Sequence, residues 1–231
     1  MFYKTLFFDL DHTLWDFESN ASESLQALFE QYQLADKGIP SFGDFFERYS
    51  HHNTRLWERY TRGFIKQDEL RWKRMWLSLL DFKIADEALA RQMSVAFLEL
   101  LPTRKKLFPY THEILQYLQQ KGYQMHLVTN GFEKVQYRKI KLSGLDGYFR
   151  ELITSEASNS LKPHKAIFEY ALQKAGADPA TTIMIGDNLE ADIQGGINAG
   201  LDTIFVNHLG IKPHVRATYE ICHLKELEGI L

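Results

Sequence analysis

The sequence is poor in cysteine, in long apolar runs and in excess charge of either sign, and each shortage excludes a class of protein. A single cysteine cannot form an intramolecular disulfide, and the Cys and His residues do not have the spacing of a zinc site. We expect this residue, Cys222, to be buried beside Ile221. No stretch approaches the roughly 18 uninterrupted apolar residues that a membrane-spanning helix needs, so no membrane partner is expected.

The balance of charge and the N-terminal residues exclude two further classes of protein. The 27 Lys and Arg residues against 30 Asp and Glu residues leave a net charge of −3, whereas a nucleic-acid binder shows a strong basic excess. Nucleic acid is therefore not an expected partner. The N-terminal stretch reaches acidic residues after a few apolar ones and has no small-residue cleavage site, so we expect no signal peptide and a cytoplasmic location.

The order of apolar segments predicts an α/β protein with an inserted helical domain. Residues 4–8 form a short apolar run that is typical of a buried strand. After residue 109 strands and helices alternate, which predicts a Rossmann-like parallel sheet with helices on both faces. Residues from about 40 to 100 carry aromatic residues on amphipathic segments and no strand-like run, which predicts a small all-helical bundle. Further strands are expected at 123–128, 152–153, 182–185 and 203–206.

Polar residues mark two expected helix starts. Ser19 and Asn20 are suitable N-caps for the first helix, and Thr111 is suitable for the helix that precedes the second strand. A helix after the second strand carries the apolar residues Val135, Ile140 and Leu142.

Polar groups follow four of the predicted strands, at the edge where open α/β sheets bind their ligands. Asp9 and Asp11 come directly after the first strand, and two carboxylates at the end of a buried strand are costly unless neutralised. A divalent cation would neutralise them, and Mg²⁺ prefers oxygen ligands. The other strand ends supply a hydroxyl with amides, one ammonium group and further carboxylates: Thr129, Asn130 and Gly131, then Lys162, then Asp187, Glu190 and Asp192.

These stretches resemble the four motifs of the haloacid dehalogenase superfamily. The motifs here read DLDHT, TNG, LKP and GDNLEAD, and the resemblance covers essentially the whole chain. The inserted helices are similar to the cap of subfamily I, which implies a catalytic core of residues 1–16 and 104–231 and a cap of residues 17–103. The longer stretches TNGFEKVQYRKIKLSGLDGYF and GDNLEADIQGGINAGLDTIFVN resemble the pyrimidine 5′-nucleotidase branch, which dephosphorylates noncanonical nucleotides.

The resemblance implies roles for the residues of the first and third motifs. Asp9 would be the nucleophile that forms an aspartyl-phosphate, and Asp11 would be the general acid and base. Lys162 would balance the charge of the transferring phosphoryl group. Halide leaves without a proton, so an Asp two residues after the nucleophile favours phosphoryl transfer over dehalogenation.

The resemblance also implies a phosphate-binding set and a metal site. Thr129, together with the amides of the Asp11–His12 turn and of the turn formed by Asn130 and Gly131, would bind the phosphoryl oxygens. Mg²⁺ would be held by a carboxylate oxygen of Asp9, the backbone carbonyl of Asp11 and the carboxylate of Asp187, while Asp192 would orient these ligands. Two residues of the helical insertion are candidates to contact the substrate base: Asn53 and Trp57.

The function expected from these residues is a Mg²⁺-dependent phosphomonoesterase for nucleoside 5′-monophosphates. The partner is then a small-molecule phosphomonoester, and the protein is expected to be a monomer or a weak dimer. A phosphatase of sugar or sugar-acid phosphates and a phosphomutase remain open as alternative enzymes. A non-catalytic phosphate-binding module on the same fold is the alternative from another class.

Overall fold

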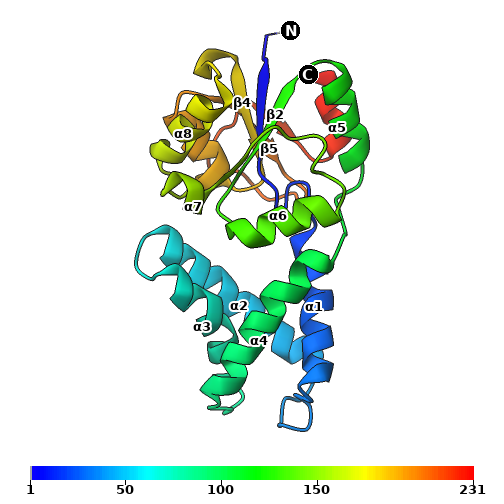
Figure 1. Ribbon diagram of the computed structural model, residues 1–231, viewed down its shortest axis with the longest axis vertical. Helices are drawn as coiled ribbons and strands as arrows, with labels where there is room; N and C mark the ends of the chain where they lie inside the picture. The colour runs from blue at the N-terminus through cyan, green and yellow to red at the C-terminus, as the bar shows by residue number, and fades with distance from the viewer. Residues whose placement is uncertain (1) are drawn as a thin grey trace. The chain divides into compact units, whose positions relative to one another are not determined.

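The computed structural model describes residues 2–231 and divides into two compact units (Figure 1). One unit, the sheet unit, spans Met1–Phe17 and Lys105–Leu231, and the other, the helical unit, spans Glu18–Arg104. The predicted roles of these parts, catalytic core and cap, remain predictions. Across residues 2–231, none of the helices combines the length and the hydropathy of a membrane span.

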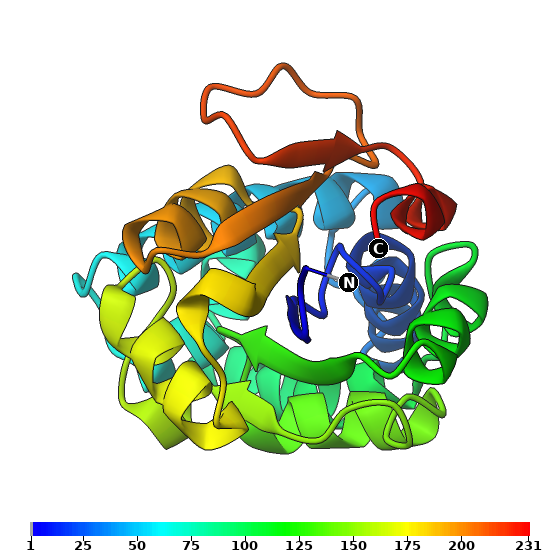
Figure 2. The same cartoon turned by 90° about the horizontal axis from the view of Figure 1, so that it is seen from above.

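The sheet unit is built on six parallel strands in the order β3-β2-β1-β4-β5-β6. The α/β class is therefore confirmed. Strand β1 lies in the middle of the sheet, where it pairs with β2 on one side and β4 on the other (Figure 2). The strands are β1 (Thr5–Phe8), β2 (Gln124–Thr129), β3 (Leu152–Thr154), β4 (Thr182–Gly186), β5 (Asp202–Val206) and β6 (Tyr219–Ile221).

The last strand was not anticipated, and it corrects the expectation for Cys222. In an edge strand successive side chains point to opposite faces. Ile221 at the end of β6 is buried, and Cys222 directly after it is exposed. The expected burial of the cysteine is therefore wrong.

Helices cover both faces of this sheet (Figure 2). On one face, Ile167 and Phe168 of α8 pack with Phe7, Val128 and Met184 from the three central strands. On the other side α5 lies against the C-terminal helical segment η4. The helical segments of this unit are α5 (Thr111–Gln120), α6 (Glu133–Leu142), α7 (Ser155–Ser158), α8 (Lys165–Ala175), η2 (Pro179–Thr181), η3 (Leu189–Gln194), α9 (Gly195–Asn198) and η4 (Leu224–Gly229).

The helical unit contains no strand among its described residues, as expected. Phe45, Tyr49 and Phe97 are fully buried at its core, whereas Trp57 and Trp72 are only partly buried. The aromatic residues therefore form the core in part and the surface in part. The elements are α1 (Phe17–Gln31), α2 (Phe42–Thr61), α3 (Gln67–Leu80), α4 (Glu87–Leu100) and η1 (Leu101–Thr103).

Both expected helix caps are wrong. Helix α1 begins at Phe17, so Ser19 and Asn20 lie within its first turn, and Asn20 is completely buried. Thr111 is the first residue of α5, and its hydroxyl donates to the carbonyl oxygens of Phe108 and Leu14 instead of accepting from the helix. The true caps that use side chains in the helical unit follow the usual rule: Ser41 accepts from the amide of Asp44, and Asp86 accepts from the amide of Leu89.

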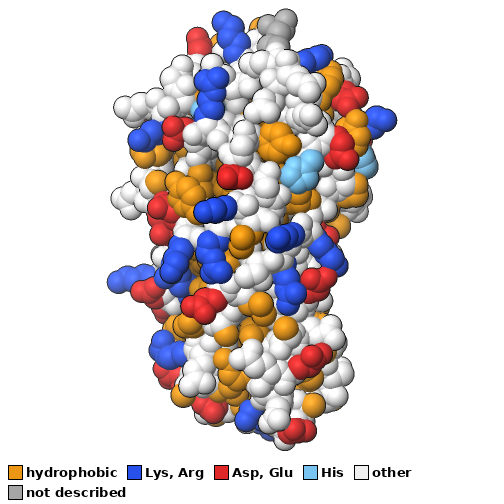
Figure 3. Space-filling model, turned by 45° about the vertical axis from the view of Figure 1, so that its right-hand side comes forward, with side chains coloured by type: hydrophobic (Ala, Val, Ile, Leu, Met, Phe, Trp, Pro, Cys, Tyr) orange, Lys and Arg blue, Asp and Glu red, His pale blue; other side chains and the backbone are white. Residues whose placement is uncertain are grey.

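The surface shows the balance of charge that the composition implies. Figure 3 shows Lys, Arg, Asp and Glu side chains interspersed over the face in view. Charge on this face is therefore mixed in sign, as the net charge of −3 suggests.

Candidate active site

The polar groups predicted at the strand ends meet at one edge of the parallel sheet. Asp9 directly follows β1, Thr129 ends β2 and Asp187 directly follows β4, and these three strands are neighbours. Lys162 lies beyond β3, in the loop before α8. Parallel strands end at a common edge, so the topology brings together residues that are far apart in the chain.

Lys162 is the centre of the buried part of this site. Its ammonium group donates to Asp9 Oδ1 at 2.5 Å, to Asp192 Oδ1 at 2.6 Å and to the carbonyl oxygen of Val128 at 2.7 Å. All three donors of the lysine are thus used. Burial by itself lowers the pKa of Lys162, but the carboxylates of Asp192 and Asp9 outweigh it and raise this pKa above the usual value. The lysine therefore stays charged inside the protein.

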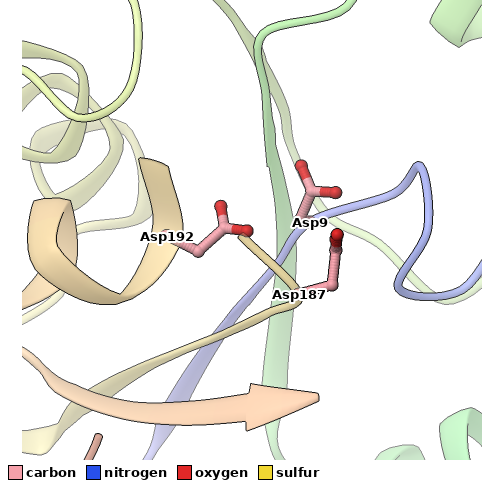
Figure 4. A group of neighbouring side chains, drawn as sticks. All are labelled: Asp9, Asp187 and Asp192. Atoms are coloured by element: carbon pink, nitrogen blue, oxygen red, sulfur yellow. The ribbon is translucent and has the colours of Figure 1, made fainter. Parts of the chain in front are cut away.

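Three carboxylates lie close together at this point, and two of them, Asp9 and Asp192, bind Lys162. Asp9, Asp187 and Asp192 each contribute one oxygen to a group whose atoms lie within 4.8 Å of one another (Figure 4). Burial, with the charges of Asp192 and Asp187, raises the pKa of Asp9 well above its usual value despite Lys162. Burial and the charge of Asp192 raise the pKa of Asp187 to about 7. Full ionisation of the three carboxyl groups would place more negative charge here than Lys162 balances, and their oxygen donors fit a hard divalent cation such as Mg²⁺.

Local backbone structure brings Asp192 to Lys162. The side chain of Asn188 caps the π-helical turn η3 by accepting from the amides of Glu190 and Ala191. Asp192 then turns its carboxylate back, and its Oδ2 accepts from the Asn188 amide at 3.0 Å. A Cβ atom on Gly186 would lie 2.3 Å from this Oδ2, so the residue before Asp187 has to be glycine. Single π-helical turns of this kind often occur at functional sites.

The loop after Asp9 folds into a tight turn. His12 has a φ of 65°, in the left-handed region, and its amide donates to the carbonyl oxygen of Trp15 at 2.9 Å. The His12 amide was a predicted phosphate donor, and here it is used inside the turn. The hydroxyl of Thr13 donates to Asp187 Oδ1 at 2.9 Å, which ties this turn to the acidic group.

Asp11 contacts two residues that the sequence did not point to. Lys139 Nζ donates to Asp11 Oδ1 at 2.5 Å, and Gln136 Nε2 donates to Asp11 Oδ2 at 3.0 Å. Both partners lie on α6, three residues apart and so on the same face of the helix. Apart from this spacing, nothing in the sequence marked the two residues, because Gln and Lys are mostly exposed in proteins.

The loop after β2 is held by its own side chains. Thr129 Oγ1 accepts from the Gly131 amide at 3.0 Å and from Gln136 Nε2 at 2.8 Å. Asn130 forms a reciprocal pair with the backbone of Lys162: its Oδ1 accepts from the amide at 2.7 Å, and its Nδ2 donates to the carbonyl at 2.9 Å. A Cβ atom on Gly131 would lie 2.3 Å from Gln136 Nε2. Glycine is therefore required here for the close approach of Gln136.

The two candidate residues of the helical unit lie one turn apart on α2. Asn53 Oδ1 accepts from Arg74 Nη1 of α3 at 3.0 Å, and Arg74 is buried against the rings of Tyr49 and Phe97. Trp57 is partly buried and packs edge-to-face on Tyr60 with ring centroids 5.7 Å apart. Their predicted contact with a substrate base stays a prediction.

Known proteins share both the sequence and the fold of this chain. A pyrimidine 5′-nucleotidase of Streptococcus pneumoniae, PynA, is 34% identical over 98% of this chain and 94% of its own length. The pyrimidine 5′-nucleotidase YjjG of Escherichia coli is 32% identical over 98% of this chain and 96% of its own length. The crystal structure of the magnesium-bound HAD-hydrolase YfnB from Bacillus subtilis has a TM-score of 0.90 at 32% identity, covering 100% of this chain and 99% of that chain.

The family itself follows from a match over most of the chain. Residues 3–200 fit the haloacid dehalogenase-like hydrolase family, and this range contains the strand ends that build the site. Together with the relatives above, the match establishes that the chain belongs to the haloacid dehalogenase-like hydrolase family.

Proposed function

We propose that this hydrolase is a Mg²⁺-dependent phosphomonoesterase that acts on pyrimidine nucleoside 5′-monophosphates, including noncanonical ones. The observation that carries the proposal is the ion pair between Asp9 and Lys162, which lies beside Asp187. Asp11 follows Asp9 by two residues. This arrangement supplies a nucleophile, a fixed positive charge, a cation site and a proton donor at one edge of the sheet. The similarity to PynA and YjjG supports the nucleotide as substrate.

In the first step Asp9 attacks phosphorus. A bond forms between a carboxylate oxygen of Asp9 and phosphorus, the ester P–O bond breaks, and the leaving oxygen takes a proton from Asp11. The products are a free alcohol and an aspartyl-phosphate on Asp9. The charge that spreads over the phosphoryl oxygens in this step is balanced by the ammonium group of Lys162.

In the second step water attacks the phosphorus of the aspartyl-phosphate. The water proton passes to Asp11, which is now a carboxylate, and the bond between Asp9 and phosphorus breaks. Inorganic phosphate leaves, and both aspartates return to their starting states. Attack on phosphorus leaves the carboxylate oxygens of Asp9 in place, whereas hydrolysis of a carbon ester in a dehalogenase would replace one of them.

Thr129 is suited to bind a phosphoryl oxygen. Both lone pairs of its hydroxyl accept hydrogen bonds, from Gly131 and Gln136. The hydroxyl hydrogen is then left to donate, and a phosphoryl oxygen is an acceptor. We assign Asn130 to holding the loop of Lys162, because its side-chain amide is engaged with that backbone. The backbone amide of Gly131 already donates to Thr129, so its predicted contact with phosphate requires that it give up this hydrogen bond.

The residues that would hold Mg²⁺ are Asp9, Asp187 and, through its backbone carbonyl, Asp11. When bound, the cation supplies positive charge that neutralises both the acidic group and the substrate phosphate. We assign Asp192 to positioning Lys162, because both of its carboxylate oxygens already accept hydrogen bonds. In this proposal the sheet unit is the catalytic core and the helical unit is the cap, whose Asn53 and Trp57 select the leaving group.

A phosphate-release panel tests this function. Purified protein is incubated with dUMP, dTMP, sugar phosphates and a sugar-acid phosphate, each with Mg²⁺ and with EDTA. The proposal predicts phosphate release from the two nucleotides that requires Mg²⁺ and is lost in Asp9→Asn but kept in Asp146→Asn, an exposed control in the same unit. Release from a sugar phosphate alone would make the enzyme a sugar phosphatase. No release from any ester would favour the non-catalytic module.

A further inference from the structure

Helix α6 lies against the loop that carries Asp11 and contacts it at three points. Lys139 and Gln136 bind the two carboxylate oxygens of Asp11, and Ser143 accepts a hydrogen bond from the indole nitrogen of Trp15 at 3.3 Å. Gln136, Lys139 and Ser143 fall on one side of the helix by their spacing. All three are buried, although none is apolar.

The environment of Lys139 is unusual for a lysine that serves only stability. Its side chain is 3% exposed, whereas the Asp11 side chain it binds is 22% exposed. Its ammonium group also lies 4.2 Å from the centre of the Trp15 ring and 5.5 Å from that of Phe17. Burying an ammonium group is costly unless it is paired, and ring faces offset part of that cost. Asp11 is therefore bound by a buried lysine while part of its own side chain stays exposed.

Gln136 is the second residue that binds Asp11, and its orientation leaves one of its own polar atoms without a partner in the described part of the chain. Its single amide nitrogen donates to both Asp11 Oδ2 and Thr129 Oγ1. Its own oxygen, Oε1, is buried and has no hydrogen-bond partner among residues 2–231. An unsatisfied buried carbonyl costs about 1–3 kcal/mol, so packing alone does not account for this orientation. The orientation is explained if both hydrogens of the amide are needed by Asp11 and Thr129.

From these contacts we propose that Lys139 and Gln136 are positioning residues that fix the carboxyl group of Asp11 for proton transfer to the leaving oxygen. The terminal torsion of an aspartate is broad, and a donor on each oxygen restricts it. The two donors occupy two of about four lone-pair sites on the carboxylate, so Asp11 keeps sites for the reacting proton. This inference rests on the proposed function, because it assigns the general acid to Asp11.

Two substrates with different leaving groups distinguish a positioning role of Lys139 and Gln136 from a purely structural one. A nucleoside leaves as an alkoxide and needs the proton of Asp11, whereas p-nitrophenolate leaves without one. We compare the first-turnover rates of nucleoside release from dUMP and of p-nitrophenolate release from p-nitrophenyl phosphate in rapid-quench experiments. The ratio of these two rates cancels losses in folding, in phosphate binding and in the nucleophile, because both substrates share them.

Lys139→Met is expected to lower this ratio about 10- to 100-fold, since misplacing a general acid forfeits much of a contribution of about 10²–10⁴. Gln136→Leu is expected to lower it less, and it decides the matter if Lys139→Met does not fold. Lys141→Met, an exposed lysine on the same helix, should leave both rates unchanged. An unchanged ratio in folded Lys139→Met and Gln136→Leu overturns the inference. Wild-type protein that releases neither product contradicts the proposed function itself, and with it this inference.

Discussion

Replacing Asp9 with Asn removes one charge from the acidic group and keeps an oxygen that can accept the hydrogen bond from Lys162. Two unit charges interact by about 332/(εr) kcal/mol, with an effective ε of about 20 in proteins. The attraction between Lys162 and Asp9 at 2.5 Å is then about 7 kcal/mol. The repulsion of Asp9 by Asp187 and Asp192, which lie within 4.8 Å, is then at least about 7 kcal/mol in all.

Since the repulsion at least offsets the attraction to Lys162, the cost of burying the Asp9 carboxylate decides the sign. That cost is several kcal/mol for a buried ion, and it agrees with the raised pKa of Asp9. We therefore expect Asp9→Asn to be inactive and yet, without metal, more stable than the wild type by about 1–3 kcal/mol. For a protein of this size each kcal/mol corresponds to about 2–4 °C in Tm.

The assay is a pair of thermal denaturation curves at mildly alkaline pH, where Asp9 and Asp187, whose pKa values are raised, are most charged. In EDTA the Tm of Asp9→Asn should lie above that of the wild type. In Mg²⁺ the wild type should gain more than the variant, because the cation then neutralises the charge that the variant lacks. A variant that is less stable than the wild type in EDTA refutes the reasoning, since it would mean that Asp9 is stabilised in its charged form by Lys162.

Three further outcomes follow from the site. Without metal, the free energy of unfolding should fall as pH rises from about 4 to about 7, because folding raises the pKa of Asp187 and the folded state holds that proton longer. Asp187 alone contributes up to about 1.4 kcal/mol per pH unit, and the raised pKa of Asp9 acts in the same direction. Mg²⁺ should flatten this slope in denaturant titrations, and a flat slope in EDTA contradicts the prediction. Gly131→Ala should displace Gln136 and lower kcat at least about 10-fold with little change in KM, as measured on dUMP. Trp57→Ala should raise KM for nucleotides several-fold and leave KM for p-nitrophenyl phosphate alone; equal effects on both substrates would remove Trp57 from the specificity set.

The sheet could be predicted because its strands are short apolar runs that end abruptly in polar residues. Thr5–Phe8 and Thr182–Gly186 are completely buried, and each stops at an aspartate. Their spacing with helices between them restricts the connections to a parallel sheet. The strand β6 escaped prediction because it is three residues long and exposed at two of them. This segment is a strand because it pairs with β5, and no local sequence pattern records that pairing.

The site was predictable where a residue ends a strand or belongs to one of the four motifs, and not where helix α6 supplies it from the side. The strand-end residues Asp9, Thr129 and Asp187 lie at the predicted edge. Helix α6 was expected to carry apolar residues, but Leu142 is exposed, and the buried positions are Gln136 and Lys139 together with Ile140. A buried lysine looks like a surface lysine in a sequence, because only the tertiary structure shows that a carboxylate faces it.

The central claim is that the phosphoryl group is transferred to Asp9, and trapping this aspartyl-phosphate tests it most directly. The enzyme is mixed with dUMP and Mg²⁺, quenched in acid during turnover and digested, and the peptide that contains Asp9 is weighed by mass spectrometry. We expect this peptide to gain the mass of one phosphoryl group in the wild type, and no gain in Asp9→Asn. Steady phosphate release with an unmodified Asp9 peptide, or with the phosphoryl group on another residue, would contradict the mechanism.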